Sequence, residues 1–360
     1  MSMHLHRRFG SALLWLLLAL AAIGLPRPLL AVDLPVLRIY NWEAYLDPEL
    51  VDEFSRRHHV KIEETYFDSD TERDRRLADG KGKGFDLAIV DTGQVAVYRD
   101  RGWLAPIGES RVPGLANMHS KWRGGGAEAT ATHAFPYAWG MVGIGYRADL
   151  VRKVPDSWLD LFQPDATTCG KLQVSGNARE LVAAALKAGA DSANSTDPAA
   201  YQRAERLLRA QKPCVATYLT TAFDADAPLV TGRASVGMIY GTDLVRLREL
   251  DPDIRFVMPR EGGILFADYV VVLASSAQKP LAYAFLQFLS EPANAARQSL
   301  FMKAATPNVG ALALLAPAIR NDEAIYPRAS DLAAAERIQR PTPAIQSKIN
   351  QIFEKTVPRN

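Results

Sequence analysis

From residue 36 onward the chain alternates short apolar runs with segments whose apolar positions recur at helical spacing. The apolar runs predict strands over 36–40, 60–67, 85–90, 234–240 and 254–259, and a further strand after the two-glycine turn within 261–273, with extended segments broken by glycines over 134–147. The amphipathic segments predict helices over 47–57, 177–189, 199–211 and 242–250, two helices within 279–300 joined at the Ser290–Pro292 turn, and a helical tail from 313. This alternation predicts an α/β fold with mostly parallel sheets covered by helices on both faces.

Two such α/β units in succession predict a protein with two lobes and a cleft between them. In open α/β sheets the carboxyl ends of the strands face the ligand crevice. We therefore expect three places at the cleft: the Trp42 region after the first strand, Asp91 after 85–90, and Tyr240 to Asp243 after 234–240.

Residues 1–31 have the organisation of an export signal. Arg7 and Arg8 precede an uncharged apolar run from Phe9 to Pro26, and a cut after Ala31 is expected. Leu29 is larger than the residue usually found before such a cut, so an uncut N-terminal anchor stays open as an alternative. We expect export to the periplasm, with a signal peptide over 1–31 and a soluble body.

The composition is that of a folded protein, and 360 residues suffice for two domains of ordinary size. Hydrophobic residues make up 48% and charged residues 23% of the chain. The formal net charge is +2, but residues 1–31 hold three arginines and no acids, which leaves 39 basic against 40 acidic side chains in the rest. This balance gives no support to nucleic acid or an anionic membrane as the partner.

The sequence holds no recognisable catalytic pattern. His58 and His59 are adjacent and cannot converge on one metal from a single helix face, and His119 and His133 lack metal-ligand spacing. The glycine-rich "GKGKG" at 80–84 precedes its strand, so we interpret it as an exposed turn and not a phosphate loop. We expect a protein that is not an enzyme, with no metal and no cofactor.

The chain has two cysteines, Cys169 and Cys214. In an oxidising compartment they could form a disulfide. The sequence does not show whether their Cα atoms come close enough, so two buried free thiols stay open as the alternative.

Aromatic and acidic residues gather near the ends of the predicted elements. Phe266 and Asp268 share one side of a strand, and an ionised carboxylate in such an apolar run costs several kcal/mol unless cations or donors meet it. The candidate ligand-binding residues are Trp42, Glu43, Tyr45, Asp91, Asn177, Glu180, Tyr240, Asp243, Phe266 and Asp268. Each alone has a structural explanation; Asp243, for example, could cap its helix. Together, aromatic walls and spaced carboxylates suit an elongated alkyl cation.

The sequence resembles the bacterial periplasmic spermidine/putrescine-binding proteins of ABC transporters over nearly all of 36–330. The resemblance rests on the ordered blocks "YNWEAYLDPELVDEF", "FDLAIVD", "FPYAWGMVGIGY", "SWLDLF", "VTGRASVGMIY", "PREGGILFAD", "TPN" and "IYP". It implies a two-lobed periplasmic binding protein fold of type II that closes around its ligand. The lobes expected are 36–139 plus 267–312, and 140–266 plus 313–360.

The resemblance also implies roles for single residues. Trp42 and Tyr45 match aromatic contacts of the first lobe, and Glu180 matches a ligand-binding acid. Asp268 matches the acid that binds an amine terminus, with Phe266 as the aromatic before it, and Asp243 matches an acid of the putrescine-type members. Cys169 stands where some members have a disulfide cysteine, whereas Cys214 is not where its partner is expected.

Several positions depart from the family pattern, and they make the aromatic box thinner and the site more acidic. The departures are Tyr240 for a Trp, Gly93 and Ala304 for ligand tyrosines, Asn177 for an Asp, Glu43 for a Ser or Thr, and Asp91 for a small hydroxyl residue. They leave the amine open: a short diamine, an agmatine-like guanidinium, spermidine or another amine.

The function predicted is capture of a polyamine in the periplasm and its delivery to an ABC permease, by a protein expected to be monomeric. The alternative is a periplasmic polyamine sensor that signals through a membrane receptor.

Overall fold

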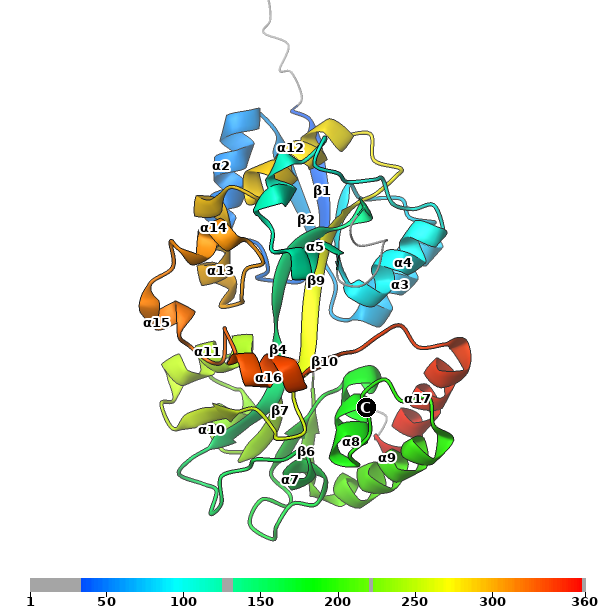
Figure 1. Cartoon of the computed structure of the whole chain (residues 1–360), viewed down its shortest axis with the longest axis vertical. Helices are drawn as coiled ribbons and strands as arrows, with labels where there is room; N and C mark the ends of the chain where they lie inside the picture. Colours follow the sequence, from blue (N-terminus) through cyan, green and yellow to red (C-terminus); the bar gives the residue numbers. More distant parts are fainter. Residues whose placement is uncertain (1–33, 125–131, 220–222, 358–360) are drawn as a thin grey trace, which may run out of the picture. The chain divides into compact units, whose positions relative to one another are not determined.

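The computed structural model describes residues 34–124, 132–219 and 223–357 (Figure 1). The predicted signal peptide, 1–31, lies outside these ranges. The strands are β1 (Val36–Asn41), β2 (Lys61–Tyr66), β3 (Leu87–Asp91), β4 (Phe135–Arg147), β5 (Leu172–Val174), β6 (Val215–Tyr218), β7 (Val236–Tyr240), β8 (Ile254–Val257), β9 (Ile264–Val272) and β10 (Glu336–Arg337).

Helices separate most of these strands along the chain. The longer ones are α2 (Pro48–His58), α3 (Asp70–Asp79), α4 (Thr92–Asp100), α8 (Ala178–Ala188), α9 (Pro198–Gln211), α11 (Gly241–Leu250), α12 (Lys279–Leu289), α13 (Pro292–Met302) and α17 (Pro343–Thr356). The shorter ones are η1 (Pro113–Asn117), α5 (Ser120–Gly124), α7 (Leu159–Phe162), η2 (Lys212–Cys214), α10 (Pro228–Thr231), α14 (Val309–Leu312), α15 (Pro317–Arg320) and α16 (Ala329–Ala334).

Local sequence explains where α2 begins and ends. The Asp47 side chain accepts a hydrogen bond from the Glu49 N–H, and Pro48 occupies the first turn, where its missing N–H costs nothing. His59 ends the helix in a left-handed conformation, and its N–H bonds to the Ser55 carbonyl. Leu50 and Phe54 form the buried face, as the helical spacing predicts.

The described strands form one mixed sheet in the order β2-β1-β3-β9-β4-β7-β5-β6, with β10 beside β9 and β8 beside β4. Five of the nine strand pairings found in these ranges are parallel and four are antiparallel. All four antiparallel pairings involve β4 or β9, the two longest strands. These two strands therefore connect the parallel group around β1 to the parallel group around β5.

The glycines of 134–147 do not interrupt the strand, contrary to the prediction, because β4 is continuous over thirteen residues. Its pairing with β9 shifts between Pro136 and Ala138 instead. The glycines leave room for neighbouring side chains: a Cβ at Gly140 would lie 2.6 Å from the Phe266 ring, and one at Gly145 would lie 2.6 Å from Ile239. They allow close packing across the sheet.

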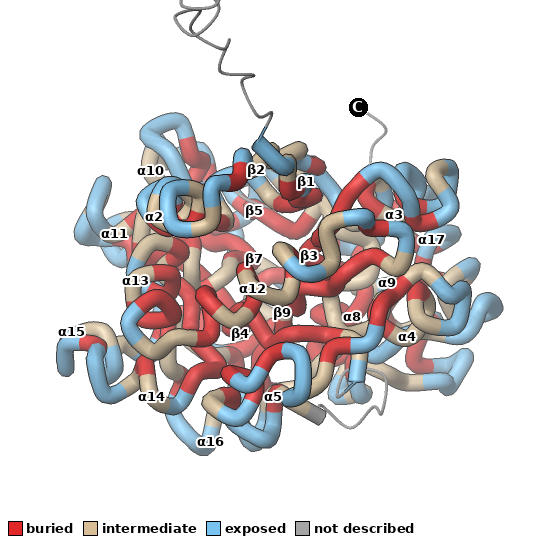
Figure 2. Tube along the Cα trace, turned by 90° about the horizontal axis from the view of Figure 1, so that it is seen from above, coloured by how far each residue is buried: buried red, intermediate tan, exposed pale blue. Residues whose placement is uncertain are grey.

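The buried side chains form three large clusters, and the strand segments that hold them run through the middle of the view in Figure 2. One cluster, which includes Phe54 and Phe285, takes all its buried residues from 36–139 and 267–312. Another, which includes Trp158, takes them from 140–266 and 313–360. The third contains residues of both sets, so the lobe boundaries stay a prediction.

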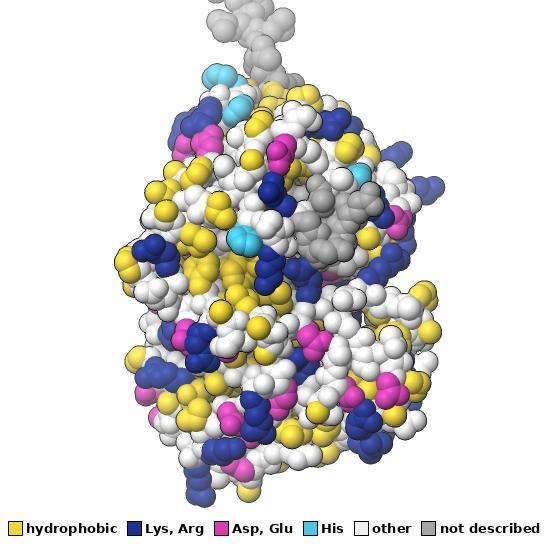
Figure 3. Space-filling view, in the orientation of Figure 1, with side chains coloured by type: hydrophobic (Ala, Val, Ile, Leu, Met, Phe, Trp, Pro, Cys, Tyr) yellow, Lys and Arg dark blue, Asp and Glu magenta, His cyan; other side chains and the backbone are white. Residues whose placement is uncertain are grey.

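The described residues from Val36 onward form one compact unit. In the ranges that the structure describes, no helix combines the length and the apolar character needed to cross a bilayer. On the face drawn in Figure 3, hydrophobic side chains gather at mid-height, between α13 and α11.

Cys169 and Cys214 are joined by a disulfide, with their Cα atoms 4.3 Å apart. The Gly170 N–H donates to the Cys214 carbonyl at 2.9 Å, which holds the two chain segments together beside the bond. Of the two alternatives left open by the sequence, the structure has the paired cysteines.

Candidate functional site

A cavity of about 390 Å³ lies where β1, β3 and β7 end and where β9 passes. All ten candidate residues predicted from the sequence line it: Trp42, Glu43, Tyr45, Asp91, Asn177, Glu180, Tyr240, Asp243, Phe266 and Asp268. Strand ends and strand β9 thus bring together residues that are more than 200 positions apart in the sequence.

The carboxylate of Asp268 accepts a hydrogen bond from the Tyr45 hydroxyl at 2.5 Å. The ion pairs found among the described residues do not include Asp268. Burial raises the pKa of Asp268 to about 7, although the hydrogen bond from Tyr45 acts in the opposite direction. The acid in the apolar strand is therefore met by a neutral donor and not by an arginine or a backbone cap.

Glu180 lies in the first turn of α8, whose first N–H groups are capped by the Asn177 side chain. Its carboxylate accepts hydrogen bonds from the Tyr240 hydroxyl and from the Ser175 hydroxyl, the latter at 2.7 Å. Burial raises the pKa of Glu180, against the effect of these hydrogen bonds. Like Asp268, Glu180 is held by hydroxyl groups that carry no charge.

Asp243 lies in the first turn of α11 and is only 7% exposed. It does not cap its helix, because the N-cap position is Tyr240 and makes no side-chain cap. Burial raises the pKa of Asp243 to about 7, while the charge of Arg246 acts to lower it. The structural explanation weighed for Asp243, helix capping, does not apply.

Aromatic rings provide apolar walls beside these acids. The rings of Tyr240 and Phe266 meet edge to face with centroids 5.4 Å apart. Across the cavity lining, Trp42 packs against Phe67 with centroids 4.4 Å apart. Such faces pack against methylene groups and attract ammonium groups.

Asp91 differs from the other acids because arginines engage it. Its two oxygens lie 3.1 Å from Arg73 Nη2 and 3.8 Å from Arg179 Nη2, and one accepts the Gly93 N–H. Burial acts to raise the pKa of Asp91, but the charges of Arg73 and Arg179 outweigh it and the net shift is downward. Asp91 is thus an acid where the resembled family has a small hydroxyl residue, but its charge is largely neutralised by the two arginines.

The sequence did not point to Asp70, Phe67, Arg179 or Arg246, which also line the cavity. Asp70 begins α3, a helix that the hydrophobic pattern does not predict because its eight polar or charged positions leave only Leu77 and Ala78 as apolar residues. Burial raises the pKa of Asp70 although Arg73 lies 2.7 Å away. The Ser69 N-cap was the one available signal for this helix.

The charge of the lining is negative overall. Seven carboxylates line the cavity, namely those of Glu43, Asp68, Asp70, Asp91, Glu180, Asp243 and Asp268. Three arginines accompany them, namely Arg179, Arg246 and Arg337. An excess of carboxylates in a partly desolvated space favours a ligand with positive charge.

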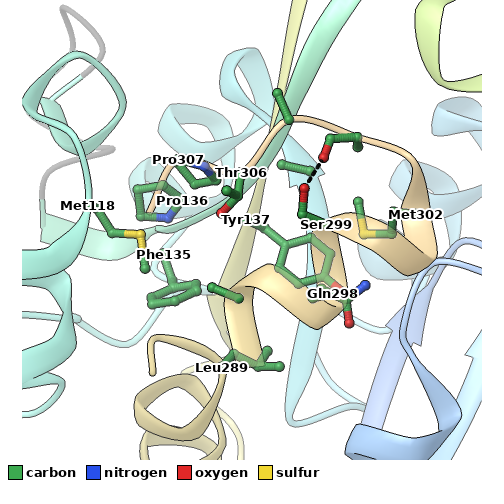
Figure 4. A pocket seen from close by; sticks show the side chains of 14 residues that line it. Met118, Phe135, Pro136, Tyr137, Leu289, Gln298, Ser299, Met302, Thr306 and Pro307 are labelled. Carbon is green, nitrogen blue, oxygen red and sulfur yellow. Dashed lines mark hydrogen bonds between the residues drawn. The ribbon is translucent and has the colours of Figure 1, made fainter. Parts of the chain in front are cut away.

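Gly93 and Ala304, which stand where the resembled family has ligand tyrosines, lie outside this cavity. Ala304 lines a separate space of about 20 Å³, shown in Figure 4, in which the Ser299 hydroxyl donates to the Ala304 carbonyl at 2.6 Å. Tyr137 also lines that space, and its hydroxyl donates to the Tyr45 carbonyl, which fixes the segment that carries Tyr45. Tyr137 therefore connects the residues around this small space to the segment that carries Tyr45.

Among the described residues, no group of three or more His, Cys, Asp or Glu side chains is arranged to hold a metal ion.

Comparison with known proteins agrees with this geometry. Residues 49–327 match the family described as bacterial extracellular solute-binding protein. The chain belongs to this family. The expected non-enzymatic class agrees with the family, whose members bind solutes.

Relatives of known name cover most of the chain. The chain is 29% identical over 310 residues to the spermidine/putrescine-binding periplasmic protein of Escherichia coli, which covers 85% of this chain and 87% of that protein. It is 28% identical over 292 residues to the norspermidine sensor of Vibrio cholerae, covering 81% and 80%.

The fold is shared with solved structures of binding proteins. The spermidine/putrescine ABC transporter substrate-binding protein of Streptococcus pneumoniae superimposes with a TM-score of 0.79 at 24% identity, over 89% of this chain and 98% of that one. The predicted fold class, a type II periplasmic binding protein, is confirmed.

Proposed function

We propose that this solute-binding protein captures a polyamine in the periplasm and delivers it to an ABC transporter. The observation that carries the proposal is that Asp268, Asp243 and Glu180 line one cavity and form no ion pair with any described residue. A buried carboxylate without a cationic partner is costly, and a ligand ammonium group supplies that partner.

A ligand with two or more amines fits this arrangement better than a single amine. The acids come from different elements, since Asp268 lies on β9 and Glu180 on α8. In the same cavity, the rings of Tyr240 and Phe266 offer apolar surface for a methylene chain. Ammonium groups at the ends of the chain form charge-assisted hydrogen bonds with the carboxylates.

Ligand binding in this proposal joins the two predicted lobes. Asp268 belongs to the predicted lobe 36–139 plus 267–312, and Glu180 and Asp243 belong to 140–266 plus 313–360. A diamine whose ends bind acids of both sets favours the arrangement in which the sets lie close together.

Calorimetric titration with putrescine, cadaverine, agmatine and spermidine tests the proposal. Saturable heat and a raised unfolding temperature are expected with at least one of them, because a ligand specific for the folded state stabilises it. Butylamine is the matched control, since it has the carbon chain of putrescine but only one amine. Its affinity is expected to be lower than that of putrescine by about tenfold or more. A folded protein that binds none of the four amines contradicts the proposal.

The partner in this role is the permease of an ABC transporter, and the protein acts as a monomer without catalysis. The relatives named as periplasmic binding proteins support this location. Detection of the mature protein in a periplasmic extract, cut after Ala31, tests the location and the signal peptide together.

A second candidate function is polyamine sensing through a membrane receptor. It is favoured by the relative named as the norspermidine sensor of Vibrio cholerae. Uptake of labelled putrescine by a deletion strain separates the two: loss of uptake supports delivery to a permease, whereas unchanged uptake with an altered transcriptional response to polyamines supports sensing.

A further inference from the structure

Arg179 lines two cavities, the acidic one described above and a second one of about 420 Å³. The second cavity lies between α3 and α4 on one side and the segment from Arg340 into α17 on the other. Figure 3 shows lysine and arginine side chains along the edge of the molecule where α3 and α4 lie in Figure 1. We name this second cavity the arginine pocket.

The arginine pocket is strongly basic. Four arginines line it, namely Arg75, Arg101, Arg179 and Arg340, against a single acid, Asp74. The carboxylate of Asp74 is already used: it accepts from Arg73 Nε at 3.0 Å and Nη2 at 2.9 Å and from the Gln94 amide and Tyr98 hydroxyl. Among the described residues that line the pocket, no carboxylate is therefore left to neutralise its arginines.

Three of these guanidinium groups lack acidic partners elsewhere too. The ion pairs formed among the described residues do not include Arg75, Arg101 or Arg340. Arg101 stacks over the Trp103 ring at 4.8 Å, which orients the group without neutralising it. Arg179 has one carboxylate nearby, that of Asp91 at 3.8 Å.

The start of a helix also borders the pocket. Pro343 and Gln346, in the first turn of the fourteen-residue helix α17, line it. Pro343 has no N–H and the Gln346 N–H donates to the Thr342 carbonyl, so the helix contributes through its dipole and not through free N–H groups of these two residues. The N-terminal turn of a helix carries partial positive charge and favours anions. Arginines from two sides of a concave space and a helix start thus favour the same kind of ligand.

We propose that the arginine pocket binds a small dissolved oxyanion with two or more negative charges, of the phosphate or polycarboxylate type. Guanidinium groups match the oxygens of such anions in bidentate geometry. Arg75, Arg101 and Arg340 are exposed and Arg179 is half-buried, and all four border one concave space beside the ligand cavity.

The anion site is coupled to the acidic cavity through Arg179 and Gly93. A Cβ at Gly93 would lie 3.0 Å from Asp91 Oδ1, 3.7 Å from Arg179 Nη2 and 3.8 Å from the Arg340 backbone nitrogen, so little separates the two spaces. An anion attracts Arg179 and adds negative potential beside Asp91. Both effects strengthen the attraction of the acidic cavity for a cation; this coupling rests on the proposed polyamine function.

Titration of the purified protein with inorganic phosphate, and separately citrate, tests the anion site without any amine. The buffer is MOPS, with sodium chloride added to hold the ionic strength constant. Saturable binding is expected, weakened about tenfold or more in the double variant Arg101→Gln, Arg340→Gln, because each removed guanidinium takes charge-assisted hydrogen bonds with it. The matched control is Arg56→Gln, Arg320→Gln, which removes the same charge from exposed arginines outside the pocket and is expected to bind phosphate as wild type does. Absence of saturable binding of both anions, or equal loss in both double variants, overturns the site.

The coupling is measured by titrating putrescine with and without saturating phosphate at one ionic strength. The amine is expected to bind about fivefold tighter or more with phosphate present, and, by linkage, phosphate about equally tighter with the amine present. Added sodium chloride is expected to weaken putrescine binding instead, because it screens the attraction between amine and carboxylate. Unchanged or weaker putrescine binding overturns the coupling. Failure to bind any amine overturns the proposed function and leaves the phosphate titration as a separate result.

Discussion

Asp91 and Asp268 lie directly opposite each other on the antiparallel strands β3 and β9. Asp91 is paired with Arg73 and is held ionised, whereas the Asp268 carboxylate accepts, among the described side chains, only the Tyr45 hydroxyl, and its pKa rises to about 7. Two identical side chains in one cavity thus have different surroundings. Asp91 belongs to an internal ion-pair network, and Asp268 is the acid that we propose binds the ligand.

Replacement of Asp268 by Asn is expected to weaken polyamine binding about tenfold or more, since it removes a charge-assisted hydrogen bond worth ~1.5–3 kcal/mol. The unliganded variant is expected to be at least as stable as wild type at pH 8, because the amide does not carry the cost of a buried charge. Calorimetry and urea unfolding measure the two effects.

Two variants serve as controls for Asp268→Asn. Asp226→Asn removes an exposed carboxylate outside the cavity and is expected to leave affinity unchanged. Tyr45→Phe removes the donor to Asp268, so the pKa of Asp268 rises further and binding weakens at pH 7 but recovers at pH 9. If Asp268→Asn bound the polyamine as tightly as wild type does, Asp268 would have a structural role and not a ligand-binding one.

Polyamine affinity is expected to fall as the pH falls from 8 to 6. The pKa values of Asp268 and Asp243 are about 7 in the unliganded protein, and a cation binds only their ionised forms. Each acid then weakens binding by roughly tenfold over this range. Titrations at pH 7 in two buffers of different ionisation enthalpy would detect the proton release that accompanies binding; equal heats in both buffers would contradict it.

The stability of the unliganded protein is expected to depend on pH in the opposite sense. Because burial raises the pKa of Asp268 and Asp243 from 3.8 to about 7, the folded state holds more protons than the unfolded state between these values. The free energy of unfolding therefore decreases as the pH rises from about 4 to about 7. Urea unfolding from pH 5 to 8 measures this slope, which should be flatter in the double variant Asp243→Asn, Asp268→Asn.

Replacement of Arg73 by Met is expected to lower the free energy of unfolding by about 3–5 kcal/mol, because it leaves the acids around it without a buried cation. The Arg73 side chain is 1% exposed and lies 2.7 Å from Asp70, 2.9 Å from Asp74 and 3.1 Å from Asp91. Arg75→Met, on the exposed face of the same helix, is the control and should change stability little. Equal unfolding curves for the two variants would show that the network contributes nothing.

The strands and helices in which apolar residues recur regularly could be predicted from the sequence. The candidate site residues near the ends of these elements could be predicted with them. Strands β1, β7 and β9 and helices α2, α8 and α11 lie where the pattern indicates, within a few residues. Asp268 stood out because a carboxylate in an apolar strand breaks the pattern. All ten candidate residues line one cavity. Those at or just after the ends of β1, β3 and β7 come together because strand ends gather at one edge of a sheet, whereas Phe266 and Asp268 lie within β9.

What the sequence could not supply were contacts between distant polar residues. Arg73 lies on a helix without an apolar stripe, so nothing in its spacing indicated that it neutralises Asp91. Likewise, a pairing register such as Asp91 opposite Asp268 depends on how β9 enters the sheet from 177 residues away. Such contacts are set by tertiary packing.

The Cys169–Cys214 bond closes a loop of 45 residues that contains α8 and α9, and with them Asn177 and Glu180. Closing a loop of this length restricts the unfolded chain by about 4 kcal/mol in the chain-entropy account. One end of the acidic cavity is therefore secured by a covalent bond that a reducing cytoplasm does not sustain. The segment that carries Asn177 and Glu180 is therefore expected to be more stable in an oxidising compartment, where the disulfide persists, than in a reducing one.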